Sequence, residues 1–252
     1  MKYFSSRAIF CIFAFVAVVA CKPVVGSTAP AKATPLPPSA TKEDWVKAIK
    51  AVYDESNTEV DGKGITEFAA CFKRGKALAP DGRPKCELFS FAKYDAFNRI
   101  TVFTPIESRL REHSSSKYLH SYVALLDCER PSIVLSPHFF GKNGWLFMER
   151  VAVMADGNIV LEHTFDHNDV QRDNNSWGVD ERARWIASGE ERMVLKKVVD
   201  SKAVIVRIIG DKGYVTVDKR DVDAMKADFA ETLAIFDALD VAAASVRPAS
   251  CN

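Results

Sequence analysis

The sequence has no excess of charge of either sign. Its 252 residues include 34 lysines and arginines and 33 aspartates and glutamates. Proteins that bind nucleic acid through its phosphates usually carry a clear basic excess, gathered on one face or element. The composition therefore disfavours nucleic acid or an anionic surface as the partner. Hydrophobic residues make up 48% of the chain, which is typical of a globular fold.

The chain also lacks an N-terminal apolar run long enough for a permanent transmembrane helix. The uncharged stretch Ala8–Ala20 would span about 20 Å as a helix, whereas the hydrocarbon core of a bilayer is roughly 30 Å thick. Lys2 and Arg7 precede this stretch, and no acidic residue does. A basic start followed by a short apolar segment is typical of an export signal, so residues 1–20 are expected to be a signal peptide.

The end of this segment, Val18-Val19-Ala20-Cys21, resembles the lipobox of bacterial lipoprotein precursors. The resemblance implies cleavage before Cys21, a diacylglyceryl group on its sulfur and acylation of the new N-terminus. More than one acyl chain gives stable anchoring. In Gram-negative members of that class an aspartate after the cysteine favours the inner membrane. Lys22 stands there instead, so the expected location is the outer membrane, facing the periplasm. The alternative is an ordinary signal peptide with a chance cysteine.

Aromatic residues are absent from Lys22–Ala40, which holds five of the 11 prolines. Such a composition cannot bury enough apolar surface to offset the entropy of an ordered chain. Residues 21–40 are therefore expected to be a lipidated cysteine and a proline-rich tether. Residues 41–252 are long enough for a single globular domain with its own core.

Cysteine is scarce: six are present, of which Cys11 lies in the signal and Cys21 is the expected lipid site. An even number in an exported domain suggests disulfides, and four cysteines allow three pairings. We expect Cys71 to pair with Cys86, because their loop is short, and Cys128 to pair with Cys251. These four positions contain no Cys-x-x-Cys pair, which disfavours a zinc site.

Helical spacing of apolar residues predicts helices at both ends of the domain. The first follows Thr41, which forms a capping-box pattern with Asp44. A shorter helix is expected over residues 65–72 and further helix over about 180–200. The last is a long helix capped by Asp221, with an apolar stripe along one face.

Between these helices apolar and polar residues alternate, which predicts strands. Four such segments follow one another from Cys86 to Phe140, and Asp156-Gly157 and Asp211-Lys212 mark the turns of two hairpins. The polar stretch 166–179 is expected to be a loop. The fold class predicted is α+β, an antiparallel sheet of roughly six to eight strands with flanking helices in a single domain.

The sequence lacks the short motifs of common enzyme classes. It contains no Gly-x-Ser-x-Gly, His-Glu-x-x-His, phosphate-binding loop or dinucleotide-binding glycine pattern. His163 and His167 are four residues apart, which along a strand is about 13 Å, too far for two ligands of one ion. A partly buried packing role is expected for His163. We therefore expect no catalytic residue, no metal and no cofactor.

Three polar residues are candidates to face a ligand: Arg207, Asp218 and His167. Arg207 interrupts an apolar strand, and the hairpin register places Asp218 diagonally opposite. An ion pair between them on the sheet surface is the structural alternative. His167 lies with Asp166 and Asp169 in a segment that lacks the spacing of a calcium loop.

Taken together, these patterns favour a non-enzymatic lipoprotein that faces the periplasm and binds another protein or an envelope component, for example as an inhibitor or immunity protein. One alternative is an envelope hydrolase with an unfamiliar site around His163, Asp166, His167 and Asp169. The other is a structural protein of envelope assembly.

Overall fold

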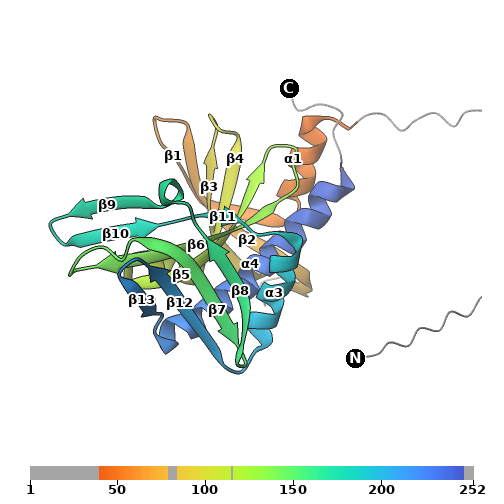
Figure 1. The fold of residues 1–252 in the computed structure, drawn as a ribbon. Coiled ribbons are helices and arrows are strands. Elements are labelled where there is room, and N and C mark those ends of the chain that lie inside the picture. Colours follow the sequence, from red (N-terminus) through yellow and green to blue (C-terminus); the bar gives the residue numbers. More distant parts are fainter. Residues whose placement is uncertain (1–39, 79–83, 115, 247–252) are drawn as a thin grey trace, which may run out of the picture. The chain divides into compact units, whose positions relative to one another are not determined.

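Strands dominate the structure, a computed structural model that describes residues 40–78, 84–114 and 116–246 (Figure 1). All of them belong to one compact unit, Pro38–Asn252. Within these ranges thirteen strands form two antiparallel sheets. The helices are α1 (Lys42–Lys50), α2 (Ile106–Ser114), α3 (Gly189–Asp200), α4 (Lys219–Ser245) and the short 3-10 helix η1 (His167–Asp169).

The larger sheet is a meander for its first six strands and is completed by three later ones. Its order is β1-β2-β3-β4-β5-β6-β10-β9, and the short β11 also pairs with β6. The bounds are β1 Tyr53–Val60, β2 Ile65–Leu78, β3 Pro84–Asp95, β4 Ile100–Pro105, β5 Lys117–Leu126, β6 Ser132–Gly141, β9 Gln171–Asn175, β10 Gly178–Arg182 and β11 Trp185–Ile186.

The smaller sheet consists of the two predicted hairpins, in the order β13-β12-β7-β8. Its strands are β7 Met148–Ala155, β8 Asn158–Thr164, β12 Val204–Gly210 and β13 Gly213–Thr216. The turn between β7 and β8 has positive φ at both Asp156 (47°) and Gly157 (86°), as a two-residue hairpin turn of this hand requires. Both hairpin predictions are confirmed.

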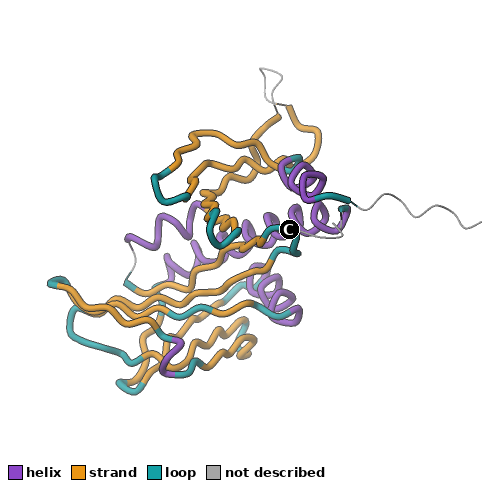
Figure 2. Tube along the Cα trace, turned by 90° about the horizontal axis from the view of Figure 1, so that it is seen from above, coloured by secondary structure: helices purple, strands orange, loops and turns teal. Residues whose placement is uncertain are grey.

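Helix α4 organises the core. Its predicted stripe is confirmed, because every member is buried: Val222, Met225, Phe229, Leu233, Phe236 and Leu239. The helix packs most extensively on β5 and also contacts β4, β6, β12 and the other three α-helices. Figure 2 shows it crossing the molecule with strands on both sides. One contiguous hydrophobic core results.

The first helix and the fold class are as predicted, but the strand count is not. Thr41 and Asp44 form both hydrogen bonds of the capping box that begins α1. The fold is α+β, with a nine-stranded sheet and a four-stranded sheet instead of one sheet of six to eight strands. The additional strands come from segments expected to be helix or loop.

Residues 65–72, predicted as helix, are the start of β2. Phe68 and Phe72 are four residues apart, which fits a helix, but the intervening Ala70 is also fully buried. Phe68, Ala70 and Phe72 share one face at the strand period of two, although the small Ala69 on the other face is also buried. The small alanine concealed this alternation in the sequence.

The segment 166–188 also differs from prediction. The expected loop 166–179 contains η1, β9 and the start of β10, residues 180–182 complete β10, and residues 185–186 form β11. Helix α3 begins only at Gly189, after a capping box formed by Ser188 and Glu191. The long helix α4, in contrast, begins earlier than expected, because its N-cap residue is Asp218 and not Asp221.

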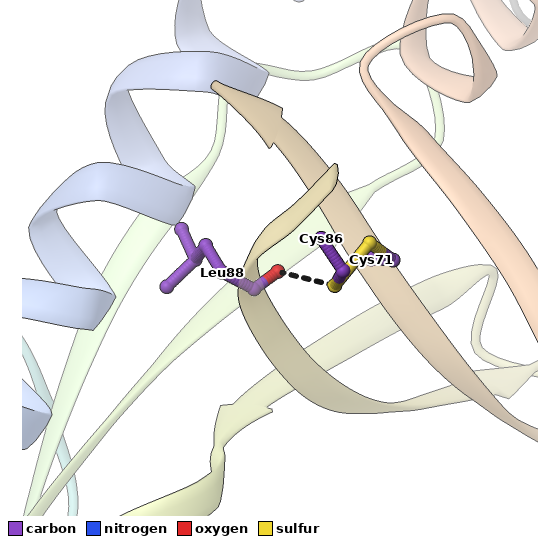
Figure 3. The surroundings of a disulfide bond; sticks show 3 residues. All are labelled: Cys71, Cys86 and Leu88. Carbon is purple, nitrogen blue, oxygen red and sulfur yellow. Dashed lines mark hydrogen bonds between the residues drawn. A yellow bond between two sulfur atoms is a disulfide. The ribbon is translucent and has the colours of Figure 1, made fainter. Parts of the chain in front are cut away.

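One predicted disulfide is confirmed: Cys71 on β2 is bonded to Cys86 on β3. Figure 3 shows the bond beside Leu88, whose side chain points toward α4. The Cys86 Sγ lies 3.8 Å from the Leu88 carbonyl oxygen, and this is a contact because a disulfide sulfur has no proton to donate. Cys128 is also disulfide-bonded. Cys251 lies outside the described residues, so its pairing with Cys128 stays a prediction.

A buried carboxylate connects the two sheets. Glu181 on β10 is fully buried and accepts hydrogen bonds from three successive backbone amides, those of Leu146 (2.6 Å), Phe147 (2.9 Å) and Met148 (2.6 Å). Arg172 lies 3.6 Å away and compensates the charge. The start of β7 is thereby fixed against the larger sheet.

The described residues contain no helix that is long and apolar enough to span a membrane.

Candidate functional site

A cleft of about 710 Å³ lies on the larger sheet. Side chains from β1 to β6, from α2 and from the segment at the end of β10 line it. A volume of this size is within the range of small-molecule sites. We take this cleft as the candidate functional site.

The apolar part of the cleft comes from β3. Leu88 and Ser90 are buried, whereas Phe89 and Phe91 alternate with them and line the cleft. The two phenylalanine rings meet edge to face with centroids 5.8 Å apart, and Phe91 is 41% exposed. A paired aromatic surface of this kind favours contact with an apolar ligand group.

The polar centre of the cleft is built where α2 follows β4. Ser108 on α2 has its hydroxyl 3.2 Å from Nδ1 of His120 on β5 and 3.2 Å from Oδ2 of Asp228 on α4. Asp228 also accepts hydrogen bonds from the backbone amide (3.0 Å) and hydroxyl (2.8 Å) of Ser121. Thr232 completes this network at 2.7 Å from the Ser121 hydroxyl.

The environment of Asp228 disfavours its charged form. Burial raises the pKa of this carboxyl well above its usual value, and the hydrogen bonds from Ser121 and Ser108 oppose that rise only in part. The network therefore holds a buried acid close behind the cleft wall.

Ser108, His120 and Asp228 are the residue types of a hydrolytic triad, but their order is wrong for that chemistry. In a triad the histidine lies between the serine and the acid and takes the serine proton. Here the serine lies between the other two, and Ser108 is only 1% exposed. Because the acid contacts the serine and not the histidine, Ser108 bridges the His120 ring and Asp228.

The cationic part of the cleft is formed by Arg109 on α2, Arg182 at the end of β10 and Arg184 just after it. Arg182 is held by Asp180, with Nε 2.8 Å from Oδ1 and Nη2 3.3 Å from Oδ2. His138 is a further partner of Asp180, with Nε2 2.9 Å from Oδ2. Burial acts to raise the pKa of Asp180, but the hydrogen bonds from Arg182 and His138 outweigh this effect and keep the pKa below its usual value.

Arg184 and Tyr122 on β5 both line the cleft. Burial raises the pKa of Tyr122, and the positive charge of Arg184 opposes this rise. Arg184 is exposed, and in the described part of the chain it forms no ion pair.

The second cavity, of about 320 Å³, lies beside α1. Its lining includes Trp45, Ile49, Tyr53 and Phe68, all of which belong to the hydrophobic core. These side chains are accounted for by packing, so this cavity is the weaker candidate.

None of the three predicted ligand-facing residues lines the cleft. Arg207 is on the smaller sheet, with its guanidinium carbon 4.5 Å from the centre of the Tyr214 ring. Asp218 caps α4 and lies 3.7 Å from the Lys117 ammonium. The ion pair predicted between Arg207 and Asp218 is therefore replaced by these two contacts. His167 is exposed at the start of η1.

His163 is partly buried, as expected, and packs against Trp185 with ring centroids 4.3 Å apart. Its Nδ1 lies 3.8 Å from a Glu191 oxygen. Ile159, earlier on the same strand, is 65% exposed, and the pairing of β8 with β7 shifts between Val153 and Met154. Within the described residues no group of three or more His, Cys, Asp or Glu side chains is placed to hold a metal ion.

Cys21, the predicted lipid site, lies outside the described residues, as do the predicted signal peptide and nearly all of the tether.

No protein-family model matches this sequence, and comparisons with curated proteins and with solved structures likewise found no match. The function is therefore argued from the cleft itself.

None of the residues that line the cleft is among those predicted from the sequence to face a ligand. The alternation of Phe89 and Phe91 with Leu88 and Ser90 was a usable signal, since it marks the open face of a predicted strand. Arg184 carried no such signal, because its segment was expected to be helical.

Proposed function

We propose that this chain is a lipid-anchored, periplasm-facing envelope protein that binds an envelope component in the cleft of the larger sheet and does not convert it chemically. The observation that carries the proposal is the pair formed by the half-buried Phe89 and the exposed Phe91 inside a cleft of about 710 Å³. Aromatic side chains that line a concavity are a typical feature of binding sites.

The chemistry around the cleft supports binding over catalysis. The serine beside a histidine and an acid is buried and lies in the wrong order for nucleophilic attack. The alternative hydrolase site around His163, Asp166, His167 and Asp169 lines neither cavity. The lipobox-like segment at Val18–Cys21 supports the anchor.

The test uses the full-length protein extracted from membranes in mild detergent. The wild type is compared with Phe91→Ser, which alters the cleft, and with Phe97→Ser. Phe97 is a matched control because it is 92% exposed at the β3–β4 turn and does not line the cleft. Co-purifying proteins, lipids and small molecules are quantified by mass spectrometry, together with the mature N-terminus.

The expected result is a component retained by the wild type and by Phe97→Ser and reduced about tenfold in Phe91→Ser, because loss of one aromatic contact at a binding centre weakens affinity by about that factor. Equal recovery from all three proteins would overturn cleft binding. An N-terminus other than acylated Cys21 would overturn the anchor.

A further inference from the structure

We infer that the ligand of the cleft carries an anionic group, a carboxylate or a phosphate, attached to an apolar body. This inference rests on the proposed function and specifies its ligand. Charged and apolar side chains are separated along the cleft.

Charges of opposite sign line opposite ends of the cleft. The acids Glu59 and Glu67 come from β1 and β2, and Glu67 is already 3.3 Å from the Lys93 ammonium. Arg182 and Arg184, which lie beside β6, line the other end without an acid among the lining residues, and Arg109 lines the cleft from α2. The chain is nearly neutral overall, so this local positive field is a property of the site.

The arginine end is fixed in place before a ligand arrives. Asp180 holds Arg182 through two hydrogen bonds and is itself held by His138, which is buried. A pre-oriented guanidinium loses little side-chain entropy when it binds a carboxylate or phosphate.

Arg184 supplies the charge for which no acid of the described chain compensates, as shown by its exposure and lack of an ion pair. The neighbouring Tyr122 and His120 add polar groups that can contact anionic oxygens. Anion recognition by arginine together with neutral donors is the usual chemistry of carboxylate and phosphate sites.

The distance from the apolar end to the arginine end determines how long the apolar part of the ligand must be. Phe91 is on β3, and Ser136, at the arginine end, is on β6, three strands away in the sheet order. Neighbouring strands are about 4.8 Å apart, so the two ends are separated by roughly 14 Å along the sheet. A ligand that spans them needs an apolar body on the order of 10 Å long beside its anionic group.

The test uses full-length protein in nanodiscs of zwitterionic phosphatidylcholine, which avoids detergent and anionic lipid. Binding is measured calorimetrically for two anionic probes, 4-phenylbutyrate as a free acid and dihexanoyl phosphatidic acid as a lipid phosphate. The neutral isostere 4-phenylbutyramide and inorganic phosphate serve as comparison compounds. Three variants are measured: Arg184→Gln, Phe91→Ser and, as a matched control, Arg207→Gln, which removes an exposed arginine from the other sheet.

The expected result is that at least one anionic probe binds ten times more tightly than the amide or inorganic phosphate. Arg184→Gln should weaken the anionic probe five- to tenfold and leave the amide unchanged, Phe91→Ser should weaken both, and Arg207→Gln should bind as the wild type does. Binding of the phosphatidic acid alone assigns a lipid headgroup as the source, and binding of phenylbutyrate assigns a free anion.

Equal affinity for the acid and the amide, no binding of either anionic probe, or wild-type affinity in Arg184→Gln would overturn the inference. The proposed function can survive that outcome. If the component recovered from cells depends on Phe91 but not on Arg184, cleft binding stands and the anionic class is wrong. If it depends on neither residue, both proposals fail.

Discussion

Asp228 is a fully buried acid whose hydrogen bonds join α4 to α2 and β5. Burial raises its pKa in the folded protein well above the value of about 3.9 expected in an unfolded chain. The half-buried Glu231, three residues along the same helix, has a pKa raised in the same direction, mainly by burial. The folded state therefore binds protons more tightly than the unfolded state at these two positions.

This difference predicts how stability changes with pH. Below about pH 4 Asp228 is protonated in both states, and its contribution to stability is complete. As the pH rises toward the folded-state pKa, the unfolded state releases the proton first, so the free energy of unfolding falls, by at most about 1.4 kcal/mol per pH unit for one proton.

Asp228→Asn removes this pH-dependent contribution to the free energy of unfolding, because the amide of asparagine stays neutral. We expect urea unfolding between pH 4.5 and 8 to show a shallower decline for the variant than for the wild type. Asp237→Asn, on an exposed position of the same helix, controls for loss of an acid from α4. Parallel profiles for Asp228→Asn and the wild type would contradict the prediction.

Single elements show where local sequence determines structure. Asp156 and Gly157 form the turn of the β7–β8 hairpin, and the Asp156 carboxylate also accepts hydrogen bonds from the amides of Lys202 (3.0 Å) and Ala203 (2.9 Å). One turn therefore also fixes the segment that leads into β12. This hairpin was predictable because its turn chemistry is local.

Gly157→Ala tests the turn. Its φ of +86° is unfavourable for alanine although no atom lies within 4 Å of the position of a Cβ, so the cost is conformational. We expect a loss of about 1–2 kcal/mol in the free energy of unfolding. Gly62→Ala is the matched control, since it also has open space and lacks a positive φ. Its effect should be within about 0.5 kcal/mol, and equal losses in both variants would refute the conformational explanation.

The elements that sequence reasoning missed lack a local signal of that kind. β9 has no buried residue, and its strand conformation comes from pairing with β10. Hydrophobic alternation cannot identify such a strand. The start of α3, by contrast, does have a local signal in the sequence, the capping box formed by Ser188 and Glu191.

At the scale of the whole molecule, α4 is the element on which the others depend. Phe229, at its middle, is fully buried. We expect Phe229→Ala to lower the free energy of unfolding by about 3–5 kcal/mol, because truncation leaves a cavity among helices and strands. Val241→Ala, on the same helix but 72% exposed, should change it by less than about 0.5 kcal/mol. Urea unfolding of both variants decides this, and similar values would show that α4 does not organise the core.

The cleft could not have been predicted from sequence, because its parts meet only in the complete sheet. Phe91, His120 and Arg184 are spread over more than a third of the chain and come together through strand order. Local periodicity places a side chain on a face of its own strand. It does not state which distant strand lies beside it.

The position of α4 near the C-terminal end of the described chain has a consequence for biosynthesis. Its partners α1, α2, α3 and β5 are all made earlier and lack their common packing surface until α4 emerges from the ribosome. Synthesis of the roughly 200 residues from α1 to α4 takes about 10–40 s at typical elongation rates. Through most of that interval the nascent chain cannot complete its core, so the earlier elements remain without their common packing partner until synthesis is almost finished.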